Sequence, residues 1–334
     1  MVAMAAATTT TMRAVVRDAY GTPDVLRLEE VPKPPLTDDG VLVRVRAASV
    51  NRADWYELAG QPAFARPMMG GVRKPKSRAV GGDFAGVVEA VGKDRHDFEP
   101  GDEVFGSRAG AFAEYVCARK AVVRKPAHVT FEEAAAVPVA ALTALQALRD
   151  HGRLQPGQRV LVNGASGGVG TFAVQIAKAL GAGEVAAVCS PRNVERAHLL
   201  GADRVFDYTH EDFTRSGERY DLLFDNAGTR SWRECVRVLE PAATVVLVGG
   251  PMRNRFLGPL GHIAAMRLAS LPGKRSTRFF VAKFNPEDLE VLRALLDDRK
   301  ITPVIDRRYE LGETADALRY MGEGHAQGKI VITM

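Results

Sequence analysis

The sequence predicts an α/β protein with a doubly wound parallel sheet, and two observations carry that prediction. The first is the run VLVNGASGGVG (residues 160–170), where a buried apolar strand breaks into a glycine-rich turn and continues as a helical pattern, TFAVQIAKAL. The second is an alternation of short apolar strands (185–189, 205–206, 222–224 and 245–248) with helical segments (193–200 and 232–239). Strands that alternate with helices indicate crossover units and therefore a parallel sheet.

The N-terminal third has a different pattern, with short strands separated by proline and glycine turns. We expect strands at 13–17, 26–30, 41–47, 81–91 and 111–118, followed by one helix over 131–149. Beyond the parallel-sheet pattern we expect, in order, a helix (263–271), a strand (278–282), a helix (286–299), a strand, a helix (313–321) and a strand (329–333). The chain is therefore expected to combine a β-rich domain with a parallel-sheet domain.

The composition is that of an ordinary globular protein of two domains. The chain has 334 residues, of which 46% are hydrophobic and 25% charged, with a net charge of +5. Its three cysteines (Cys117, Cys189 and Cys235) lie far apart, which argues against a disulfide framework and favours the cytoplasm. The basic run RKPKSR (73–78) has no interleaved aromatic residues, so a nucleic-acid partner is not favoured.

No apolar stretch approaches the roughly 18 residues that a membrane span needs. Residues 1–11, MVAMAAATTTT, are of low complexity and are expected to form a flexible tail. The natural start is left open between Met1, Met4 and Met12.

The glycine-rich turn predicts a site for a dinucleotide. A strand that enters a helix through glycines presents free backbone N–H groups and the positive end of the helix dipole to a phosphate. Its glycines lie at 164, 167 and 170, which departs from G-x-G-x-x-G because residue 165 is alanine. The alternative for such a turn alone is a tight turn without a ligand.

The strand after this turn indicates which dinucleotide binds. A site for NAD has an acidic residue at the carboxyl end of that strand, but Glu184 stands at its start. The strand ends instead in Ser190 and Arg192, a hydroxyl and a guanidinium that suit a 2′-phosphate, and Tyr208 could add a phenol donor. We therefore expect NADPH, the alternative being that Arg192 is only solvated.

Several motifs together give the chain a family resemblance. They are NRADWY (51–56), GGDFAGVVEAVG (81–92), PGDEVFG (100–106), NGASGGVGTFAVQIAKALGA, CSPRN, LGADRVFDY and GHAQGKIVI. From about Met12 onward the chain resembles the medium-chain dehydrogenase/reductase superfamily, and within it the zinc-free quinone oxidoreductases of the zeta-crystallin-like and reticulon-interacting-protein-like type.

The resemblance implies a GroES-like catalytic domain (12–128 and 276–334) into which a Rossmann NADPH-binding domain (129–275) is inserted. It places the active site in the cleft between the domains, and it implies a homodimer. The pyrophosphate would lie on Ser166, Gly167, Gly168 and Val169. Ser190, Arg192 and Tyr208 would contact the adenosine phosphate, and Gly249 and Phe280 would line the nicotinamide.

The ligands of zinc-dependent relatives are missing here. Ser49-Val50-Asn51 stands where those relatives have a cysteine, and Gly81-Gly82-Asp83 stands where they have Gly-His-Glu, so we expect no metal. Without a Lewis acid, an activated acceptor is favoured, because its charge delocalises into an enolate or hydroquinone. The expected reaction is hydride transfer from NADPH to a quinone or α,β-unsaturated carbonyl. An enoyl-thioester reductase and a non-catalytic NADPH-binding or sensor protein are the alternatives, and the physiological acceptor is left open.

Two residues are candidates for the chemistry. Tyr56 matches a tyrosine of similar quinone reductases and could donate a proton to the substrate oxygen, the alternative being solvent. Asn51 could orient the substrate or the nicotinamide by its amide. Asp54 and Asp83 are interpreted as turn or structural residues.

Overall fold

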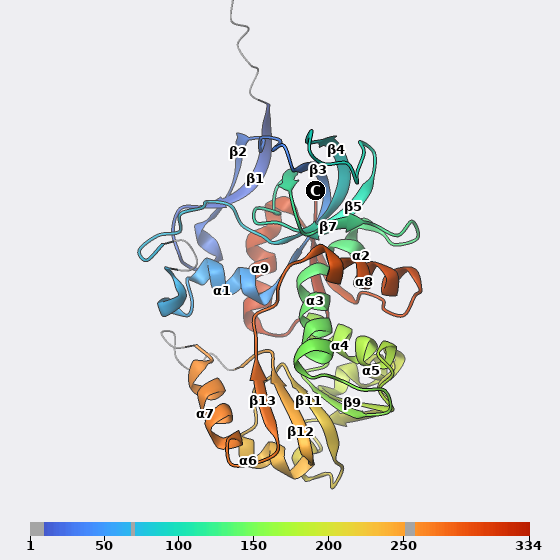
Figure 1. Cartoon of the computed structure of the whole chain (residues 1–334). Helices are drawn as coiled ribbons and strands as arrows, with labels where there is room; N and C mark the ends of the chain where they lie inside the picture. The colour runs from blue at the N-terminus through green and yellow to red at the C-terminus, as the bar shows by residue number, and fades with distance from the viewer. Residues whose placement is uncertain (1–9, 68–70, 251–257) are drawn as a thin grey trace, which may run out of the picture.

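Two large β-sheets at opposite ends of the molecule organise the chain, as Figure 1 shows. The structure is a computed structural model that describes residues 10–67, 71–250 and 258–334. Residues 1–9 of the expected tail lie outside the described residues, and Thr11, which was expected to belong to that tail, already begins strand β1 (Thr11–Arg17).

The parallel sheet has six strands in the order β10-β9-β8-β11-β12-β13. Their bounds are β8 (Arg159–Asn163), β9 (Glu184–Cys189), β10 (Arg204–Asp207), β11 (Tyr220–Asp225), β12 (Leu239–Leu247) and β13 (Ser276–Phe279). Side chains alternate along β8, because Val160 and Val162 join one apolar cluster and Leu161 joins another. The first cluster includes helix α4 (Gly168–Ala179), and the second includes helices α6 (Trp232–Cys235) and α7 (Leu260–Ser270).

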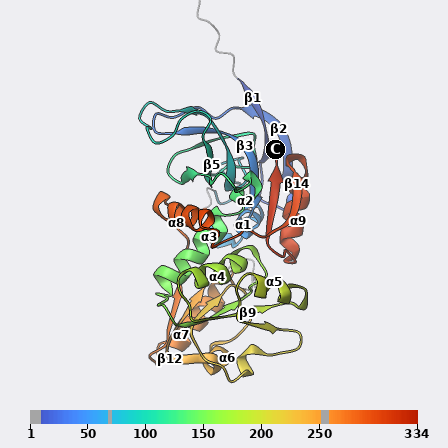
Figure 2. The same ribbon diagram turned by 90° about the vertical axis from the view of Figure 1, so that its right-hand side faces the viewer.

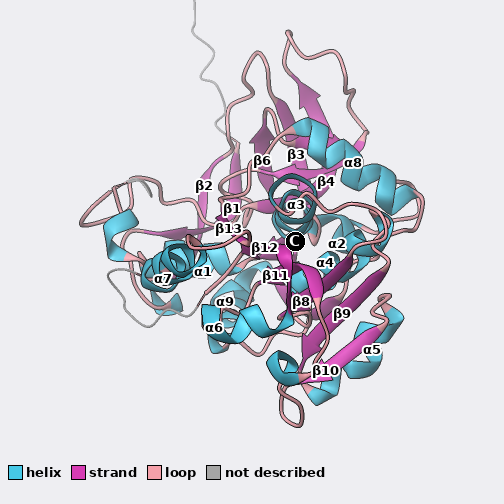
Figure 3. Ribbon diagram, turned by 60° about the horizontal axis from the view of Figure 1, so that its bottom comes forward, coloured by secondary structure: helices cyan, strands magenta, loops and turns pink. Residues whose placement is uncertain are grey.

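This arrangement confirms the expected doubly wound sheet, which Figure 3 shows with its covering helices. The strand order reverses between β8 and β11, and ligands of such sheets bind beyond the carboxyl ends of the strands at that point. The two strand ends are joined there by a hydrogen bond from Asn163 Nδ2 to Asp225 Oδ1 (2.8 Å).

The second sheet has the order β14-β15-β3-β4-β5-β7, with β6 also paired to β3. Its strands are β3 (Val41–Val50), β4 (Asp83–Val91), β5 (Glu103–Ser107), β6 (Tyr115–Ala118), β7 (Val122–Arg124), β14 (Ile305–Glu310) and β15 (Lys329–Thr333). β1 pairs separately with β2 (Leu26–Pro32). β15 pairs with β3, so the end of the chain completes a sheet begun near its start. Figure 2 shows helix α9 (Thr314–Glu323) beside β14.

The structure corrects several of the expected bounds. The helix expected over 232–239 ends at Cys235, and after a 3-10 turn (Val236–Val238) β12 already begins at Leu239 instead of residue 245. β13 pairs with β12, so Ser276–Phe279 belong to the parallel sheet, and we propose that the domain boundary expected at residue 276 lies beyond Phe279. The helix expected over 131–149 is divided into α2 (Phe131–Ala135), α3 (Pro138–Gln146) and a π-helical turn (Ala147–His151). Pro138 causes the first break, because proline has no N–H for the preceding turn and favours the first position of a helix.

Two strands and one α-helix that the structure describes were also not expected from the sequence. They are the strands β5 and β7 and the helix α1 (Arg52–Ala59). The remaining helices are α5 (Val194–Leu199) and α8 (Pro286–Asp297), both close to their expected positions.

Candidate cofactor and catalytic site

The glycine-rich turn connects β8 to α4 in the way that a phosphate site requires. Gly164 has φ of +90°, a left-handed conformation that glycine adopts at low cost. A Cβ on Gly170 would lie 2.1 Å from the carbonyl oxygen of Gly164, so the first turn of α4 packs directly on the loop. A Cβ on Gly167, the N-cap residue of α4, would meet nothing within 4 Å. The inner side of the turn is thus closed and its outer side is open.

Ser166, Gly168 and Val169 lie in the same turn and are all partly exposed. α4 is 12 residues long, and its first backbone N–H groups have no partner within the helix. These groups and the helix dipole therefore face the open side of the turn, where an anion is favoured.

The residues expected to recognise the adenosine phosphate come together at one edge of the sheet. Ser190 follows β9 and Tyr208 follows β10, and these strands are adjacent and parallel, with Asp207 opposite Cys189. The Tyr208 N–H donates to the carbonyl oxygen of Cys189 (3.2 Å), and its side chain is 56% exposed. Arg192 is exposed, and Ser190 Oγ accepts a hydrogen bond from Asn193 Nδ2 (2.8 Å). The edge therefore offers a hydroxyl, a guanidinium and a phenol.

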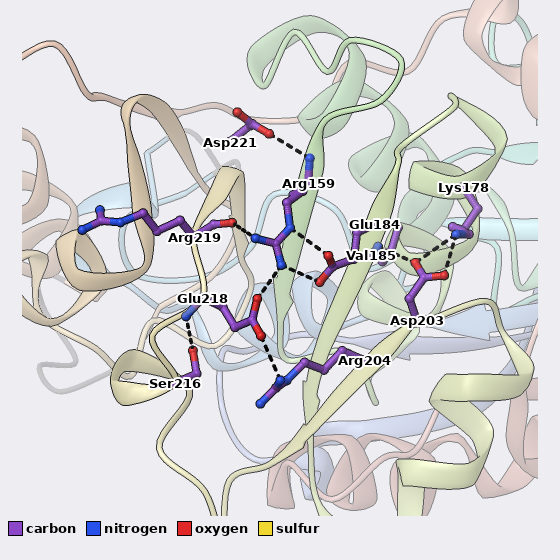
Figure 4. A network of polar contacts seen from close by, with 10 residues as sticks. All are labelled: Arg159, Lys178, Glu184, Val185, Asp203, Arg204, Ser216, Glu218, Arg219 and Asp221. Atoms are coloured by element: carbon purple, nitrogen blue, oxygen red, sulfur yellow. Dashed lines mark hydrogen bonds and ion pairs between the residues drawn. The ribbon is translucent and has the colours of Figure 1, made fainter.

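Glu184 lies at the opposite edge of the sheet, within the polar network that Figure 4 shows. Arg159 Nε donates to Glu184 Oε2 (2.8 Å), and the same guanidinium also pairs with Glu218. The hydrogen bond from Arg159 holds the pKa of the Glu218 carboxyl below its usual value. Glu184 is thus paired with Arg159 at the start of β9, at the other end of the strand from Ser190. It is therefore no candidate for a ribose contact.

Gly249 and Phe280 follow the last two strands of the parallel sheet. A Cβ on Gly249 would lie 2.3 Å from the carbonyl oxygen of Asn226, so a side chain does not fit there. The Phe280 ring stacks on His151, with centroids 4.2 Å apart and an angle of 20° between the planes. Both residues are partly exposed; Gly249 packs against the segment that follows β11, whereas Phe280 follows β13, the edge strand of the sheet.

A buried polar cluster occupies the ends of three adjacent strands, β15, β3 and β4. We call it the Lys329 cluster; its members are Ser49, Asn51, Asp54, Asp83 and Lys329. Lys329 is 2% exposed and Asp83 is completely buried. Lys329 Nζ donates to Asn51 Oδ1 and lies 3.7 Å from Asp83 Oδ2. A lysine ammonium thus lies beside residues 51 and 83, in the two segments where the sequence has no zinc ligands.

Hydrogen bonds fix the Asp83 carboxylate inside this cluster. Its oxygens accept from Asn51 Nδ2 (2.8 Å), from Ser49 Oγ (3.2 Å) and from the Val139 N–H (3.2 Å). Burial nevertheless raises the pKa of Asp83, and the positive charge of Lys329 opposes that rise. Burial likewise lowers the pKa of the Lys329 ammonium, which Asp83 and Asp54 oppose.

The cluster also touches the nucleotide turn. A Cβ on Gly168 would lie 2.7 Å from Lys329 Cδ, so the lysine stem packs under the first residue of α4. Because the Asn51 amide donates to Asp83 and accepts from Lys329, its polar atoms are engaged within the protein. The Asn51 amide therefore contacts Asp83 and the ammonium, and its expected role in orienting the substrate or the nicotinamide stays a prediction.

Tyr56 lies one helical turn after Arg52 on α1 and is partly buried. Its ring meets Trp55 edge to face, with centroids 5.4 Å apart, and the Arg52 guanidinium carbon is 5.8 Å from the ring centre. Burial raises the pKa of the Tyr56 phenol, so it holds its proton throughout the neutral range.

Sequence reasoning missed Lys329. It lies in the quoted motif GHAQGKIVI, where KIVI has the pattern of a buried strand. A lysine at the head of a buried strand was the available signal, because lysine is almost never fully buried unless it is paired. In the part of the chain that the structure describes, no group of three or more His, Cys, Asp or Glu residues is arranged to hold a metal. Nor is any described helix long and apolar enough to cross a bilayer.

Comparisons with known proteins cover nearly the whole chain. Residues 37–127 match the family described as "Alcohol dehydrogenase GroES-like domain", and residues 200–332 match "Zinc-binding dehydrogenase". A 2-methylene-furan-3-one reductase of Solanum lycopersicum is 33% identical over 328 residues, which are 94% of this chain and 76% of that protein. A chloroplastic NADPH-dependent alkenal/one oxidoreductase of Arabidopsis thaliana is 31% identical over 336 residues, 96% of this chain and 79% of that protein. The solved quinone oxidoreductase of Coxiella burnetii has a TM-score of 0.84 and 29% identity, covering 97% of this chain and 100% of its own.

Proposed function

The chain belongs to the medium-chain dehydrogenase/reductase superfamily, among its quinone oxidoreductase relatives, and from that premise we propose that it is a zinc-independent, NADPH-dependent reductase of quinones and α,β-unsaturated carbonyls. The observation that carries this proposal is the meeting of the open glycine turn with the Lys329 cluster, through the contact of Gly168 with the lysine stem. A site for a hydride donor thus adjoins a buried polar site that could face an acceptor.

The residues present fit NADPH. The open side of Gly167 and the free N–H groups of α4 suit the pyrophosphate, with Ser166, Gly168 and Val169 around it. Ser190, Arg192 and Tyr208 supply donors for the 2′-phosphate, and Gly249 and Phe280 would line the nicotinamide. NADPH, when bound, supplies the hydride; the chain itself binds, orients and provides hydrogen-bond donors.

The residues present do not fit zinc. Asn51 offers an amide instead of a thiolate, and Gly82 offers no side chain. The Lys329 ammonium lies between Asn51 Oδ1 and Asp83, where a divalent cation would be repelled at close range. The negative charge that develops on an acceptor oxygen must therefore be held by hydrogen-bond donors.

The acceptor class follows from that requirement. The printed names of the tomato and Arabidopsis relatives refer to a methylene-furanone and to alkenals or alkenones, in which a C=C bond is conjugated to a carbonyl. In such acceptors charge spreads onto the carbonyl oxygen as hydride arrives, so a neutral donor can stabilise it. Tyr56 on α1 remains the proposed contact of the acceptor, and Asn51, whose amide is engaged with Asp83 and Lys329, is proposed to hold the ammonium in position.

A screen of acceptors tests the proposal. Oxidation of NADPH and of NADH is followed with quinones, enones and enoyl thioesters, each with and without a chelator. We expect turnover of a quinone or an enone with NADPH that the chelator does not change. Turnover of the thioester alone would favour the enoyl-thioester alternative, and tight NADPH binding with no turnover would favour a sensor.

Two further proposals concern assembly and location. β13 is an edge strand of the parallel sheet, and the exposed apolar residues Phe279 and Val281 lie at its end, which supports a homodimer through this edge. Light scattering at micromolar concentration would measure its mass. The three free cysteines support a reducing compartment, which we propose to be the cytoplasm, with the plastid of the Arabidopsis relative as the alternative.

A further inference from the structure

Asp54 has a carboxyl oxygen that faces the space left by the missing side chain of Gly82. It lies in the first turn of α1 and is 8% exposed. Its Oδ2 accepts a hydrogen bond from the Asn51 N–H (2.7 Å), and within the described part of the chain that is the only hydrogen bond of its carboxyl group. Its Oδ1 lies 3.8 Å from the point that a Cβ on Gly82 would occupy.

Gly82 creates the space that Asp54 faces. A Cβ there would have only two atoms within 4 Å, Asp54 Oδ1 and Ser107 Oγ (3.9 Å). Gly82 is partly exposed, so the space is not sealed. Ser107 Oγ itself donates to the carbonyl oxygen of Gly82 (3.1 Å). A polar group of a substrate could therefore approach Asp54 at the position where a side chain at residue 82 would otherwise stand.

The charges around Asp54 favour a carboxyl group that keeps its proton near neutral pH. Burial is the largest cause, and the negative charges of Asp83 and Glu57 act in the same direction. The Asn51 N–H and the Lys329 ammonium oppose them, and the pKa of Asp54 rises to about 7. The Lys329 ammonium lowers the pKa of Asp54 only in part, because it lies against Asp83 and Asn51.

We propose that Asp54 is the residue that donates the proton to the acceptor, through Oδ1 and the space beside Gly82. This inference rests on the proposed function. As hydride adds to the carbon β to the carbonyl, the C=C electron pair moves toward the carbonyl oxygen. The O–H bond of Asp54 then breaks, its proton goes to that enolate oxygen, and the carboxylate regains a proton from solvent. The reduced product has gained one hydride and one proton.

Tyr56 is the rival donor, and its phenol differs in acidity. Burial raises the pKa of Tyr56 above that of an ordinary phenol, so it releases a proton less readily than Asp54 does at neutral pH. Both candidates lie on α1, and a comparison of a variant of each in one assay tells which of them donates the proton.

The experiment compares Asp54→Asn, Tyr56→Phe and Glu57→Gln with the wild type on an enone. Asparagine can still accept from the Asn51 N–H but cannot supply the acidic proton, and Glu57 serves as a half-exposed carboxylate control on the same helix. We expect Asp54→Asn to lower kcat by about 10²–10⁴-fold, the usual worth of a general acid. It should abolish the fall of wild-type kcat above neutral pH and leave the Kd for NADPH within about threefold of the wild type. Glu57→Gln should keep the rate below neutral pH and should keep the alkaline limb but move it to lower pH, because the Glu57 charge is one of the causes that raise the pKa of Asp54.

A second readout needs neither cofactor nor turnover. Infrared difference spectra of the unliganded protein between pH 5 and 9 should show a buried carboxyl that loses its proton near neutrality. Asp54→Asn should lack that signal and keep any signal of Asp83 and Asp225, whose pKa burial also raises. Wild-type kcat and pH profile in Asp54→Asn, or loss of the alkaline limb in Tyr56→Phe alone, would overturn the role of Asp54. So would the absence of such a titration in the wild type, which can be judged even if a variant misfolds. Failure of the wild type on every acceptor would refute the proposed function instead.

Discussion

Replacement of Lys329 by methionine should destabilise the protein by about 3–5 kcal/mol, because it leaves a buried carboxylate without its cation. Lys329 is 2% exposed and Asp83 is completely buried, with 3.7 Å between Nζ and Oδ2. Methionine keeps most of the apolar stem that packs under Gly168 and removes only the charge.

The size of the effect follows from this geometry. At that separation an effective dielectric constant of about 20 gives an attraction of roughly 4–5 kcal/mol. Asp83 would keep its donors Asn51, Ser49 and the Val139 N–H, so it is not fully orphaned. It could also escape by taking up a proton, because burial already raises its pKa.

That escape gives the prediction a pH dependence. Loss of the lysine raises the folded-state pKa of Asp83 further above its unfolded value. Such a group destabilises the fold increasingly as the pH rises above the unfolded pKa and ceases to do so once the pH falls below it. The cost of Lys329→Met should therefore be larger at pH 8 than at pH 5.

Urea unfolding of four proteins measures the effect: the wild type, Lys329→Met, Asp83→Asn and the double variant. Trp55 lies on α1 and Trp232 on α6, so fluorescence reports on both sheets. The double variant should be more stable than the sum of the single changes allows, by at least about 1 kcal/mol. Strict additivity, or a cost below 1 kcal/mol for Lys329→Met at pH 8, would refute the assigned pairing.

Other predictions concern the nucleotide site and the metal. Arg192→Ala should weaken NADPH about 10–150-fold and leave NADH unchanged in calorimetric titrations, since one charge-assisted contact is worth about 1.5–3 kcal/mol; equal losses would contradict the phosphate role. Gly170→Ala should lower Tm and NADPH affinity, because its Cβ would lie 2.1 Å from Gly164 O, whereas the control Gly167→Ala, with nothing within 4 Å, should keep the wild-type Tm. Purified protein should contain well under one zinc per chain by elemental analysis, and a tightly held stoichiometric zinc would contradict the assignment of the Lys329 cluster.

The local pattern of the sequence was sufficient for most of the fold. The glycine turn after an apolar strand and the strand–helix alternation predicted the parallel sheet, because both depend on residues close together in the chain. The sequence placed the domain boundary before β13 because that strand has only four residues, and its place in the parallel sheet depends on pairing with β12. The break at Pro138 was visible in the sequence, but the alanine-rich pattern around it favoured one continuous helix.

The candidate site was predicted in part, for a comparable reason. Ser190, Arg192 and Tyr208 follow strands whose ends meet in any parallel sheet of this order, so their proximity could be expected. Lys329 and Asn51 are 278 residues apart, and only the pairing of β15 with β3 brings them together. Asp54 has the sequence pattern of a residue in a helix-capping box, and it does accept from the Asn51 N–H. The space beside it depends on Gly82, which is distant in the sequence.

The pairing of β15 with β3 also has a consequence for synthesis. Every strand of the parallel sheet precedes residue 280, so that sheet can form while β15 is still inside the ribosome. Until β15 arrives, the Ala47–Val50 end of β3 is an open edge whose backbone N–H and C=O groups lack their partners in β15, which makes it a template for unwanted association. A nascent chain can thus form its parallel sheet before the Lys329 cluster exists. The need for chaperones should be greatest in that interval.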